Sequence, residues 1–309
     1  MKIFKIFLCI LLLSPAVRSD EPISIIINAG AANATFEFHG KIENDISNED
    51  KDAFDITDDN LKRGVEALMG AWPNYVSLGH WQDIYKQRKW TPVKITLKPI
   101  KGKVIRISSE PVIVSTHTLN NLFSNKATFK AGISTEVRNS ITSSWFQSLS
   151  KTVGDQISFG INFKVPGANG SELSGGISST NSISFTSNWG VRSYKETSIA
   201  VGSSSEVLVD LEPGQEAVAV LSATKGSIEV QIDYLTSLQG NVACEFSKTY
   251  RGRYYWRQDI NTVLSAIDMP IHILSRQTLK IGYYSEAKVT LTDRKSNKTL
   301  YEGPGVFRT

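Results

Sequence analysis

Residues 155–187 contain two stretches in which apolar and polar side chains alternate, and this pattern restricts the fold more than any other feature of the chain. In both stretches the apolar residues stand at odd positions. They are Ile157, Phe159, Ile161, Phe163 and Val165 in the first stretch, and Leu173, Ile177, Ile183 and Phe185 in the second. A period of two predicts a hairpin of two strands with one apolar face and one hydroxyl-rich face.

The loop between the two strands determines which residues lie opposite one another. A two-residue turn at Asn169-Gly170 pairs odd positions with even ones, and therefore places the two apolar sets on opposite faces. We instead predict a five-residue loop, 166–170, centred on Ala168. This register places Phe163 opposite Leu173, Ile161 opposite Gly175 and Phe159 opposite Ile177.

The length of the first strand fits a membrane span. Residues 155–165 cover about 36 Å at roughly 3.3 Å per residue, and a tilt of about 40° reduces this to roughly 28 Å. That distance is close to the thickness of the hydrocarbon core. Two interpretations remain open, a hairpin that inserts into a membrane and a long solvated hairpin of a β-sandwich.

The N-terminus predicts a secreted protein. Lys2 and Lys5 precede the apolar run 6–13, and a small-residue site follows at Ser19, so residues 1–19 are predicted to be a cleaved signal peptide. Cleavage reduces the 34 Lys and Arg residues to 31, against 30 Asp and Glu residues. A nearly neutral chain has little general attraction for nucleic acid, which we therefore do not expect as a partner.

Secretion also bears on whether the chain has a disulfide and whether its asparagines carry glycans. Cys9 leaves with the signal, so the remaining Cys244 has no partner for a disulfide and is predicted to be a buried small hydrophobe. Three sequons make the chain a candidate glycoprotein, at Asn33, Asn169 and Asn297.

Residues 20–100 are predicted to form a small N-terminal lobe that contains helices and recognises a surface. Asp58 or Asp59 can cap a helix with an apolar face that ends at Gly70, and a second short helix is expected over 81–89. The lobe is rich in aromatic residues: Trp72, Tyr75, Trp81, Tyr85 and Trp90. Either they fill a core, or they form a partly exposed patch that binds a glycan, a lipid headgroup or a protein receptor.

Residues 101–309 are predicted to be a β module, with strands beginning at Val93 and no βαβ rhythm. Long strands and sparse turns suggest an elongated antiparallel protein, in which Pro99, Gly102 and Pro111 separate the first segments and 213–214 and 225–226 separate later ones. The expected strands are 93–97, 104–107, 112–116, 206–211, 217–221, 228–235, 279–284, 287–292 and 299–302. A further strand is expected over 248–257, with Tyr250, Tyr254 and Trp256 on its inner face and Arg251, Arg253 and Arg257 pairing with carboxylates outside. The alternative is a strip that binds sugars or a membrane interface.

The sequence contains no motif for catalysis or cofactor binding. The four histidines lack metal-ligand spacing, and no zinc, phosphate-loop, nucleophile-elbow or dinucleotide motif occurs. The acidic run 43–59 lacks the glycine and terminal glutamate of a calcium loop and is interpreted as a solvated, helix-capping segment. We expect no enzyme activity, no metal and no cofactor.

A β-rich chain with a Ser/Thr-rich amphipathic hairpin in its middle, then a Pro-Gly turn at 213–214 and further strands, resembles the aerolysin-like β-pore-forming proteins. The epsilon-toxin and mosquitocidal-toxin branch is the most similar, over roughly residues 100–300. A fainter resemblance extends to insect follicular-epithelium yolk proteins and slime-mould spherulins. The resemblance implies an elongated, mainly β, antiparallel architecture and a pore-forming role as a toxin or defence factor.

The resemblance also implies roles for the hairpin residues. The protein would bind a cell surface, form a ring-shaped homo-oligomer and insert the hairpin into the bilayer as part of a transmembrane barrel. The nine odd apolar residues named above would face lipid. The pore would be lined by Ser158, Asn162, Lys164, Glu172, Ser174, Ser178 and Ser182.

Two other functions are compatible with the sequence. One is a secreted storage or coat protein of the yolk or spherule type, which keeps the fold but does not insert. The other is a glycan-binding lectin. A glycan on Asn169 would favour a protein that does not insert, because this residue lies in the loop that would have to cross the membrane.

Overall fold

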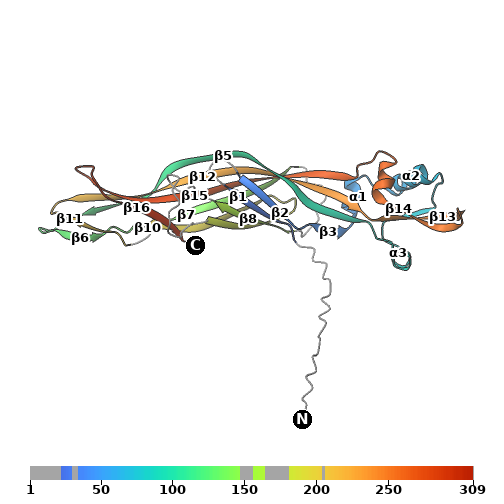
Figure 1. The fold of residues 1–309 in the computed structure, drawn as a ribbon, viewed down its shortest axis with the longest axis horizontal. Helices are drawn as coiled ribbons and strands as arrows, with labels where there is room; N and C mark the ends of the chain where they lie inside the picture. The colour runs from blue at the N-terminus through green and yellow to red at the C-terminus, as the bar shows by residue number, and fades with distance from the viewer. Residues whose placement is uncertain (1–21, 30–33, 147–155, 164–180, 204–205, 309) are drawn as a thin grey trace, which may run out of the picture.

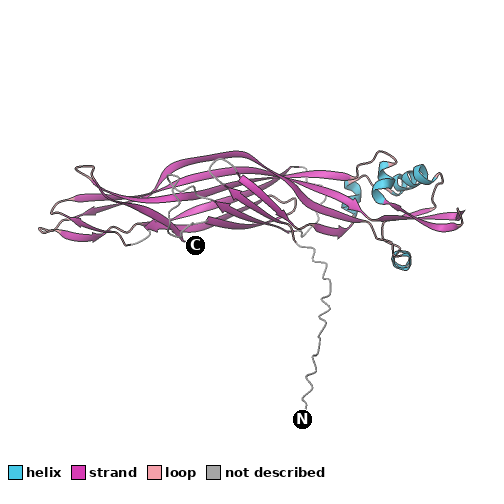
Figure 2. Ribbon diagram, in the orientation of Figure 1, coloured by secondary structure: helices cyan, strands magenta, loops and turns pink. Residues whose placement is uncertain are grey.

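The computed structural model describes residues 22–29, 34–146, 156–163, 181–203 and 206–308. These residues form an elongated rod of long strands, with the helices gathered at one end (Figure 1 and Figure 2). The predicted mainly β, antiparallel, elongated architecture is confirmed.

Three very long strands run along the rod, and they carry its main sheet. They are β5 (Lys94–Asn120), β12 (Glu216–Gln239) and β15 (His272–Asp293), with β12 in the middle and antiparallel to both neighbours. Four more strands complete a seven-stranded sheet in the order β16-β10-β7-β15-β12-β5-β3. These are β3 (Ile42–Asp45), β7 (Ser134–Phe146), β10 (Ser193–Ser203) and β16 (Thr299–Arg308).

The expected long strands are present, but several of the breaks predicted within them are wrong. The segments 93–97, 104–107 and 112–116 all belong to β5, the segments 217–221 and 228–235 to β12, and 279–284 and 287–292 to β15. The last strand extends beyond 302 to Arg308, whereas 206–211 shortens to β11 (Leu208–Leu211), which pairs with β6 (Ala127–Lys130).

The prolines of β5 and the glycine of β12 do not interrupt these strands. Beyond Leu97 only β12 pairs with β5 among the described strands, so a missing N–H at Pro99 or Pro111 need not interrupt a ladder. Pro99 also adjoins a bulge, where the register shifts by one residue. In β12, Gly226 leaves space for the ring of Tyr283, whose Cζ would lie 2.1 Å from an added Cβ.

The predicted strand over 248–257 is also wrong, because the chain reverses there. β13 (Asn241–Tyr250) and β14 (Arg253–Asp259) form a hairpin whose two turn residues, Arg251 and Gly252, have φ of 48° and 80°. Positive φ at both central residues is the conformation that matches the twist of a two-residue hairpin. The alternation of aromatic residues and arginines is typical of a strand. The two-residue turn at Arg251-Gly252 was therefore not predicted from the sequence.

A second sheet of four strands lies against the middle of the rod, in the order β2-β1-β8-β9. Its members are β1 (Ser24–Ala29), β2 (Ala34–His39), β8 (Gln156–Phe163) and β9 (Asn181–Asn188). The largest apolar core lies between this sheet and the long strands. It combines isoleucines of β1 and β8 with residues of β12 and β15 such as Ile232 and Ile281.

The helical end contains α1 (Asn48–Ala53), α2 (Asp58–Met69), α3 (Gln82–Arg88) and α4 (Ile260–Ser265), together with β4 (Tyr75–Ser77), β13 and β14. Residues 20–100, expected as one lobe, are thus divided between two places. Strands β1 and β2 pair within the sheet of the hairpin, whereas 48–88 join residues 241–269 at the end of the rod. We call this end the helical lobe.

Both expected helices of the lobe are present. Helix α2 begins after Thr57, whose hydroxyl accepts the amide of Asn60 at 3.1 Å, so the cap is Thr57 instead of Asp58 or Asp59. Gly70 ends the helix with φ of 76°, as expected. The acidic run also supplies a cap, because Ser47 and Asp50 form a capping box at α1.

The close packing of α2 on α4 depends on Gly64. A Cβ at this position would lie 2.4 Å from the carbonyl oxygen of Val263. We expect Gly64→Ala to lower the free energy of unfolding by about 1–3 kcal/mol through overpacking, although alanine is the better helix former. The measurement is urea unfolding, with Gly132→Ala as the control, because the nearest atom there is 3.8 Å away. Equal midpoints for Gly64→Ala and the wild type would contradict this packing.

Candidate functional site

The apolar face of the hairpin is buried inside the protein. Ile157, Phe159 and Ile161 of β8 are at most 2% exposed, and Phe185 of β9 is 3% exposed. On one side β8 pairs in parallel with β1, so that Ile25 lies beside Phe159 and Ile27 beside Ile161. The residues predicted to face lipid thus contribute to the largest core of the described structure.

The hairpin pairs in a different register from the one predicted. Odd positions do face odd positions, but Phe159 lies opposite Phe185 and Ile161 opposite Ile183, so the pairing is not centred on Ala168. The rings of Phe159 and Phe185 are 5.9 Å apart. A period of two determines the face of each residue and admits any even shift of register. Contacts with β1 and the long strands select among these registers.

Several predicted hairpin residues lie outside the part of the chain that the structure describes. Among those expected to face lipid they are Val165, Leu173 and Ile177, and among those expected to line a pore they are Lys164, Glu172, Ser174 and Ser178. The side chains of Phe163, Ser182 and Ile183 are not described either, although their backbones belong to β8 and β9.

Two predicted pore-lining residues are described, and both lie on the other face of β8. Ser158 and Asn162 are half-buried. The side-chain amide of Asn162 donates to Oδ1 of Asn28 at 3.0 Å, and the main-chain amide of Ser158 donates to the carbonyl of Ile23 at 2.9 Å. On the polar face of β8, the side chain of Asn162 is thus hydrogen-bonded to β1, whereas the bond of Ser158 belongs to the backbone ladder.

A buried aromatic cluster holds the base of the hairpin against the long strands. Trp189 follows β9 directly, and its ring centroid lies 4.3 Å from that of Trp145 on β7 and 5.1 Å from that of Tyr234 on β12. Sequence reasoning missed this cluster, because its members are more than 40 residues apart and share no motif.

A chain of polar side chains continues from the aromatic cluster to β9. The hydroxyl of Tyr234 donates to Gln277 at 2.6 Å, and the amide of Gln277 donates to Ser143 at 2.7 Å. Ser143 and Ser187 have hydroxyl oxygens 3.4 Å apart, and Ser193 donates to Ser187 at 3.3 Å. Burial raises the pKa of Tyr234 well above its usual value, which keeps its proton available for the bond. We call the aromatic cluster and this chain together the latch.

The aromatic residues predicted for the helical lobe divide into buried and exposed members. Tyr85 is 3% exposed, and its hydroxyl lies within hydrogen-bond distance of the carbonyls of Ser77 and Asn241, so it joins α3 to β4 and β13. Trp72 and Tyr75 are 48% and 55% exposed, whereas Trp81 and Trp90 are half-buried. The lobe therefore uses these residues both as core and as surface.

Arg88 of α3 links two of the aromatic side chains of this surface. Its guanidinium lies 5.6 Å from the ring centroid of Trp90 and 5.8 Å from that of Tyr255. Tyr255 in turn meets Trp81 edge-on at 6.4 Å. Two aromatic rings thus flank a single cation and a third ring contacts one of them, which is a suitable surface for stacking on sugars or on lipid headgroups.

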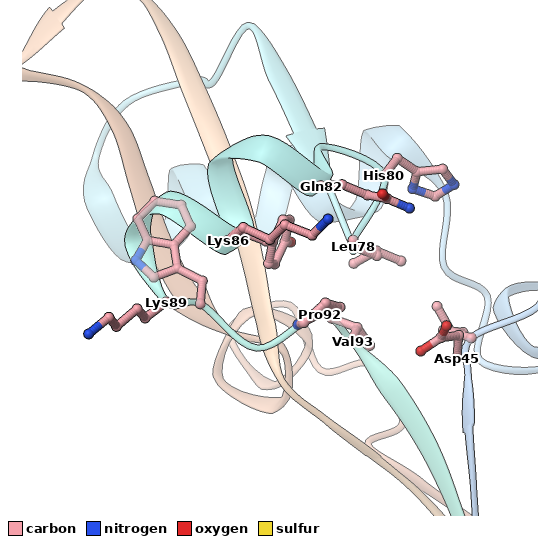
Figure 3. Close-up of a pocket in the computed structure, with 12 residues that line it drawn as sticks. Asp45, Leu78, His80, Gln82, Lys86, Lys89, Pro92 and Val93 are labelled. Atoms are coloured by element: carbon pink, nitrogen blue, oxygen red, sulfur yellow. The ribbon is translucent and has the colours of Figure 1, made fainter.

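Two clefts lie on either side of helix α3. One, of about 710 Å³, is lined by residues such as His80, Lys86 and Trp90. Figure 3 shows Gln82 and Lys86 reaching over this cleft, with Pro92 and Val93 on its other side. The other cleft, of about 680 Å³, is lined by residues that include Trp81 and Tyr255.

Among the described residues no ion pair joins Arg251, Arg253 or Arg257 to a carboxylate, although such pairs were expected. Arg251 lies 5.1 Å from the ring centroid of Tyr250, and Arg253 lies 5.5 Å from that of Trp256. Tyr254, expected on the inner face, is 52% exposed. The turn at Arg251-Gly252 explains these differences, because it separates the residues into two strands.

Cys244 is fully buried, and burial raises the pKa of its thiol to about 12, as expected for a small hydrophobe. Of the three sequons, Asn297 lies exposed in the turn between β15 and β16, and Asn33 and Asn169 fall outside the described residues. Within the described ranges, no group of three metal-binding side chains and no helix long and apolar enough to cross a bilayer occurs.

Sequence comparison identifies the family. The chain is 32% identical over 269 residues to U-megalopygitoxin(8)-Mc8 of Megalopyge crispata, an alignment that covers 86% of this chain and 89% of the relative. U-megalopygitoxin(8)-Mo12 of Megalopyge opercularis is equally similar, at 32% over 270 residues. The chain belongs to the U-megalopygitoxin(8) family. No protein-family model matches it.

The fold of this megalopygitoxin is also that of a known toxin structure. The crystal structure of parasporin-2, a Bacillus thuringiensis toxin that recognises cancer cells, superposes with a TM-score of 0.55 over 82% of this chain and 98% of that one. The sequences are only 14% identical, so the likeness concerns the fold alone. The described part of the chain thus has the fold of parasporin-2, an elongated and mainly β architecture as expected.

The latch predicts how the megalopygitoxin responds to loss of one hydroxyl. Tyr234→Phe keeps the ring packing and leaves Oε1 of Gln277 buried without its donor, which we expect to lower the free energy of unfolding by about 1–3 kcal/mol. Chemical denaturation measures the change. Tyr254→Phe is the matched control and should be neutral, because that side chain is half exposed. Equal stability of Tyr234→Phe and the wild type would show that the latch contributes nothing.

Proposed function

We propose that this megalopygitoxin is a secreted pore-forming toxin. It binds a cell surface through the helical lobe, assembles into a ring, and releases the hairpin 155–187 to form a transmembrane β-barrel with its neighbours. The observation that supports this most directly is the burial of the described apolar side chains of the hairpin, Ile157, Phe159, Ile161 and Phe185, in a chain that belongs to a family of toxin-named proteins.

The energetics favour a docked hairpin in water. Full burial of a large apolar side chain is worth about 1.5–3 kcal/mol, so exposing Ile157, Phe159, Ile161 and Phe185 together costs about 6–12 kcal/mol. This equals the entire stability of many domains. The hairpin therefore stays docked until another apolar medium replaces the core, and a bilayer is such a medium.

Ring assembly follows from the backbone. A single hairpin in hydrocarbon leaves the outer N–H and C=O groups of both strands without partners, which is costly. A closed barrel built from hairpins of several copies satisfies every group. In such a barrel Ile157, Phe159, Ile161, Phe163 and Val165 face lipid, with Ser158 and Asn162 toward the lumen.

The first step requires a surface contact, and the helical lobe offers one. Trp72 and Tyr75 are exposed at this end, and Tyr75 lines the same cleft as Trp81 and Tyr255. Exposed tryptophan and tyrosine are the residues that most often dominate binding energy at protein surfaces. We assign surface recognition to this lobe, with a glycan, a lipid headgroup or a protein as receptor.

A reversible tether tests hairpin release. Ser143 on β7 and Ser187 on β9 are buried, with hydroxyl oxygens 3.4 Å apart, so the double variant Ser143→Cys/Ser187→Cys is placed to form a disulfide across the latch. We expect the oxidised variant to release no calcein from vesicles of target-cell lipids, and the reduced variant to release it as the wild type does.

The oxidised wild type is the control for the redox treatment, and mass spectrometry confirms the bond. Leakage that persists with the disulfide formed would refute hairpin release. Absence of leakage from the wild type, before and after limited proteolysis, would favour a storage or coat protein. Full glycan occupancy of Asn169 in peptide mapping would argue the same way.

The double variant Trp72→Ala/Tyr75→Ala tests recognition by the lobe. We expect binding of labelled protein to target cells in the cold to fall at least tenfold, since interface anchors of this type are worth about 2 kcal/mol or more each. Leu68→Ala is the control, as Leu68 is a partly exposed apolar residue of the same lobe. Cell binding by Trp72→Ala/Tyr75→Ala at the level of the wild type would move the receptor site elsewhere.

A further inference from the structure

The rod carries an exposed apolar pair at the end opposite the helical lobe. Leu122 and Phe123 lie in the loop between β5 and β6, where they are 84% and 67% exposed. Leu122 has the largest exposed fraction among the large apolar side chains that the structure describes. Strands β6 and β11 lie at this far end in Figure 1. We call the pair the apolar tip.

The loop that carries the tip is held by a buried asparagine. Asn121 is 0% exposed, and its side-chain amide donates to the carbonyl of Leu211 at 2.7 Å and to that of Asn125 at 3.0 Å. Its side-chain oxygen accepts the amide of Phe123 at 3.0 Å. A buried amide with all these partners fixes the backbone of the loop.

The main chain of Asn121 ties the same loop to its neighbour. Its N–H donates to the carbonyl of Gln215 at 3.0 Å, and its carbonyl accepts the amide of Gly214 at 2.9 Å. The two apolar side chains are therefore presented to solvent by a fixed support. A contact that they make requires little ordering of the loop, which favours binding.

The charges beside the tip nearly cancel, with two lysines paired to three carboxylates. Lys126 lies 3.5 Å from Asp210 and 3.6 Å from Glu212, and Lys130 pairs with Glu206 further along the strands. These ion pairs leave no strong field of either sign at this end. A partner that binds the tip must therefore recognise its apolar surface.

The size of the tip selects the kind of partner. A stable protein–protein contact buries about 800 Å² on each side, which two side chains cannot supply. A bilayer interface accepts a small apolar projection, because the gain depends on the area immersed and requires no matching surface. An aromatic ring is also well suited to the headgroup level.

We propose that Leu122 and Phe123 insert into the interface of a lipid bilayer and anchor the protein to it. Strand β2 leads into β3, which pairs with residues 94–97 beside the helical lobe. Because β1 is antiparallel to β2 and β8 is parallel to β1, β8 runs toward the end of the rod that carries the tip. The anchor goes beyond the proposed function, because it needs neither a receptor nor release of the hairpin.

The test is sedimentation of the full chain with phosphatidylcholine vesicles that contain no receptor. We expect Leu122→Ser/Phe123→Ser to lower the partition coefficient by roughly tenfold or more, with the same result at low and high salt. Ile113→Ser/Leu274→Ser is the control, because these apolar residues are 69% and 56% exposed and lie on β5 and β15, away from the tip. Near-UV circular dichroism checks that each variant is folded.

A second measurement locates the contact. Phe123→Trp should gain emission that brominated phosphatidylcholine quenches, whereas Ile113→Trp should not. Unchanged partitioning of the tip variant, equal losses in tip and control variants, or no vesicle binding by the wild type would each overturn the anchor. Because none of these measurements uses leakage, failure of the anchor and failure of pore formation remain distinguishable.

Discussion

The structure depends on the burial of one face of β8. Ile157, Phe159 and Ile161 complete a core whose other walls are β1 and the long strands β12 and β15. Alternating apolar residues give a strand one apolar face. Such a face is required in a sheet that packs on another sheet, and equally in a barrel wall that faces lipid. The same side chains can therefore stabilise two environments, and the surroundings decide which one they occupy.

The contacts that hold the hairpin in the docked state are of two kinds. Strand β1 pairs with β8 in parallel, a slightly weaker arrangement per residue than antiparallel pairing. The base of the hairpin is fastened more specifically, by rings of Trp145, Trp189 and Tyr234 and by a polar chain that passes through Gln277. Buried polar bonds stabilise the docked state only while every partner is in place, so the proposed release of the hairpin would have to break the latch.

The two ends of the rod carry different surfaces. The helical lobe presents aromatic rings with a cation between two of them, a surface suited to recognition of polar ligands. The opposite end presents an apolar pair on a fixed loop among paired charges. In a toxin family with this fold, the long strands are the rigid connection between these ends, and the hairpin lies between them.

The sequence by itself determined the mainly β class, the helices of the lobe, the burial of Cys244 and the apolar face of the hairpin, because each of these depends on local periodicity or composition. It did not determine the register of Phe159 against Phe185, the continuity of β5 through Pro99 and Pro111, or the reversal at Arg251-Gly252. Those features were decided by partners distant in the chain. A period of two is unchanged when the register shifts by two residues, so only tertiary contacts could select the register. A proline interrupts a strand only where a neighbouring strand needs its N–H, so only the arrangement of the strands could decide whether β5 continues.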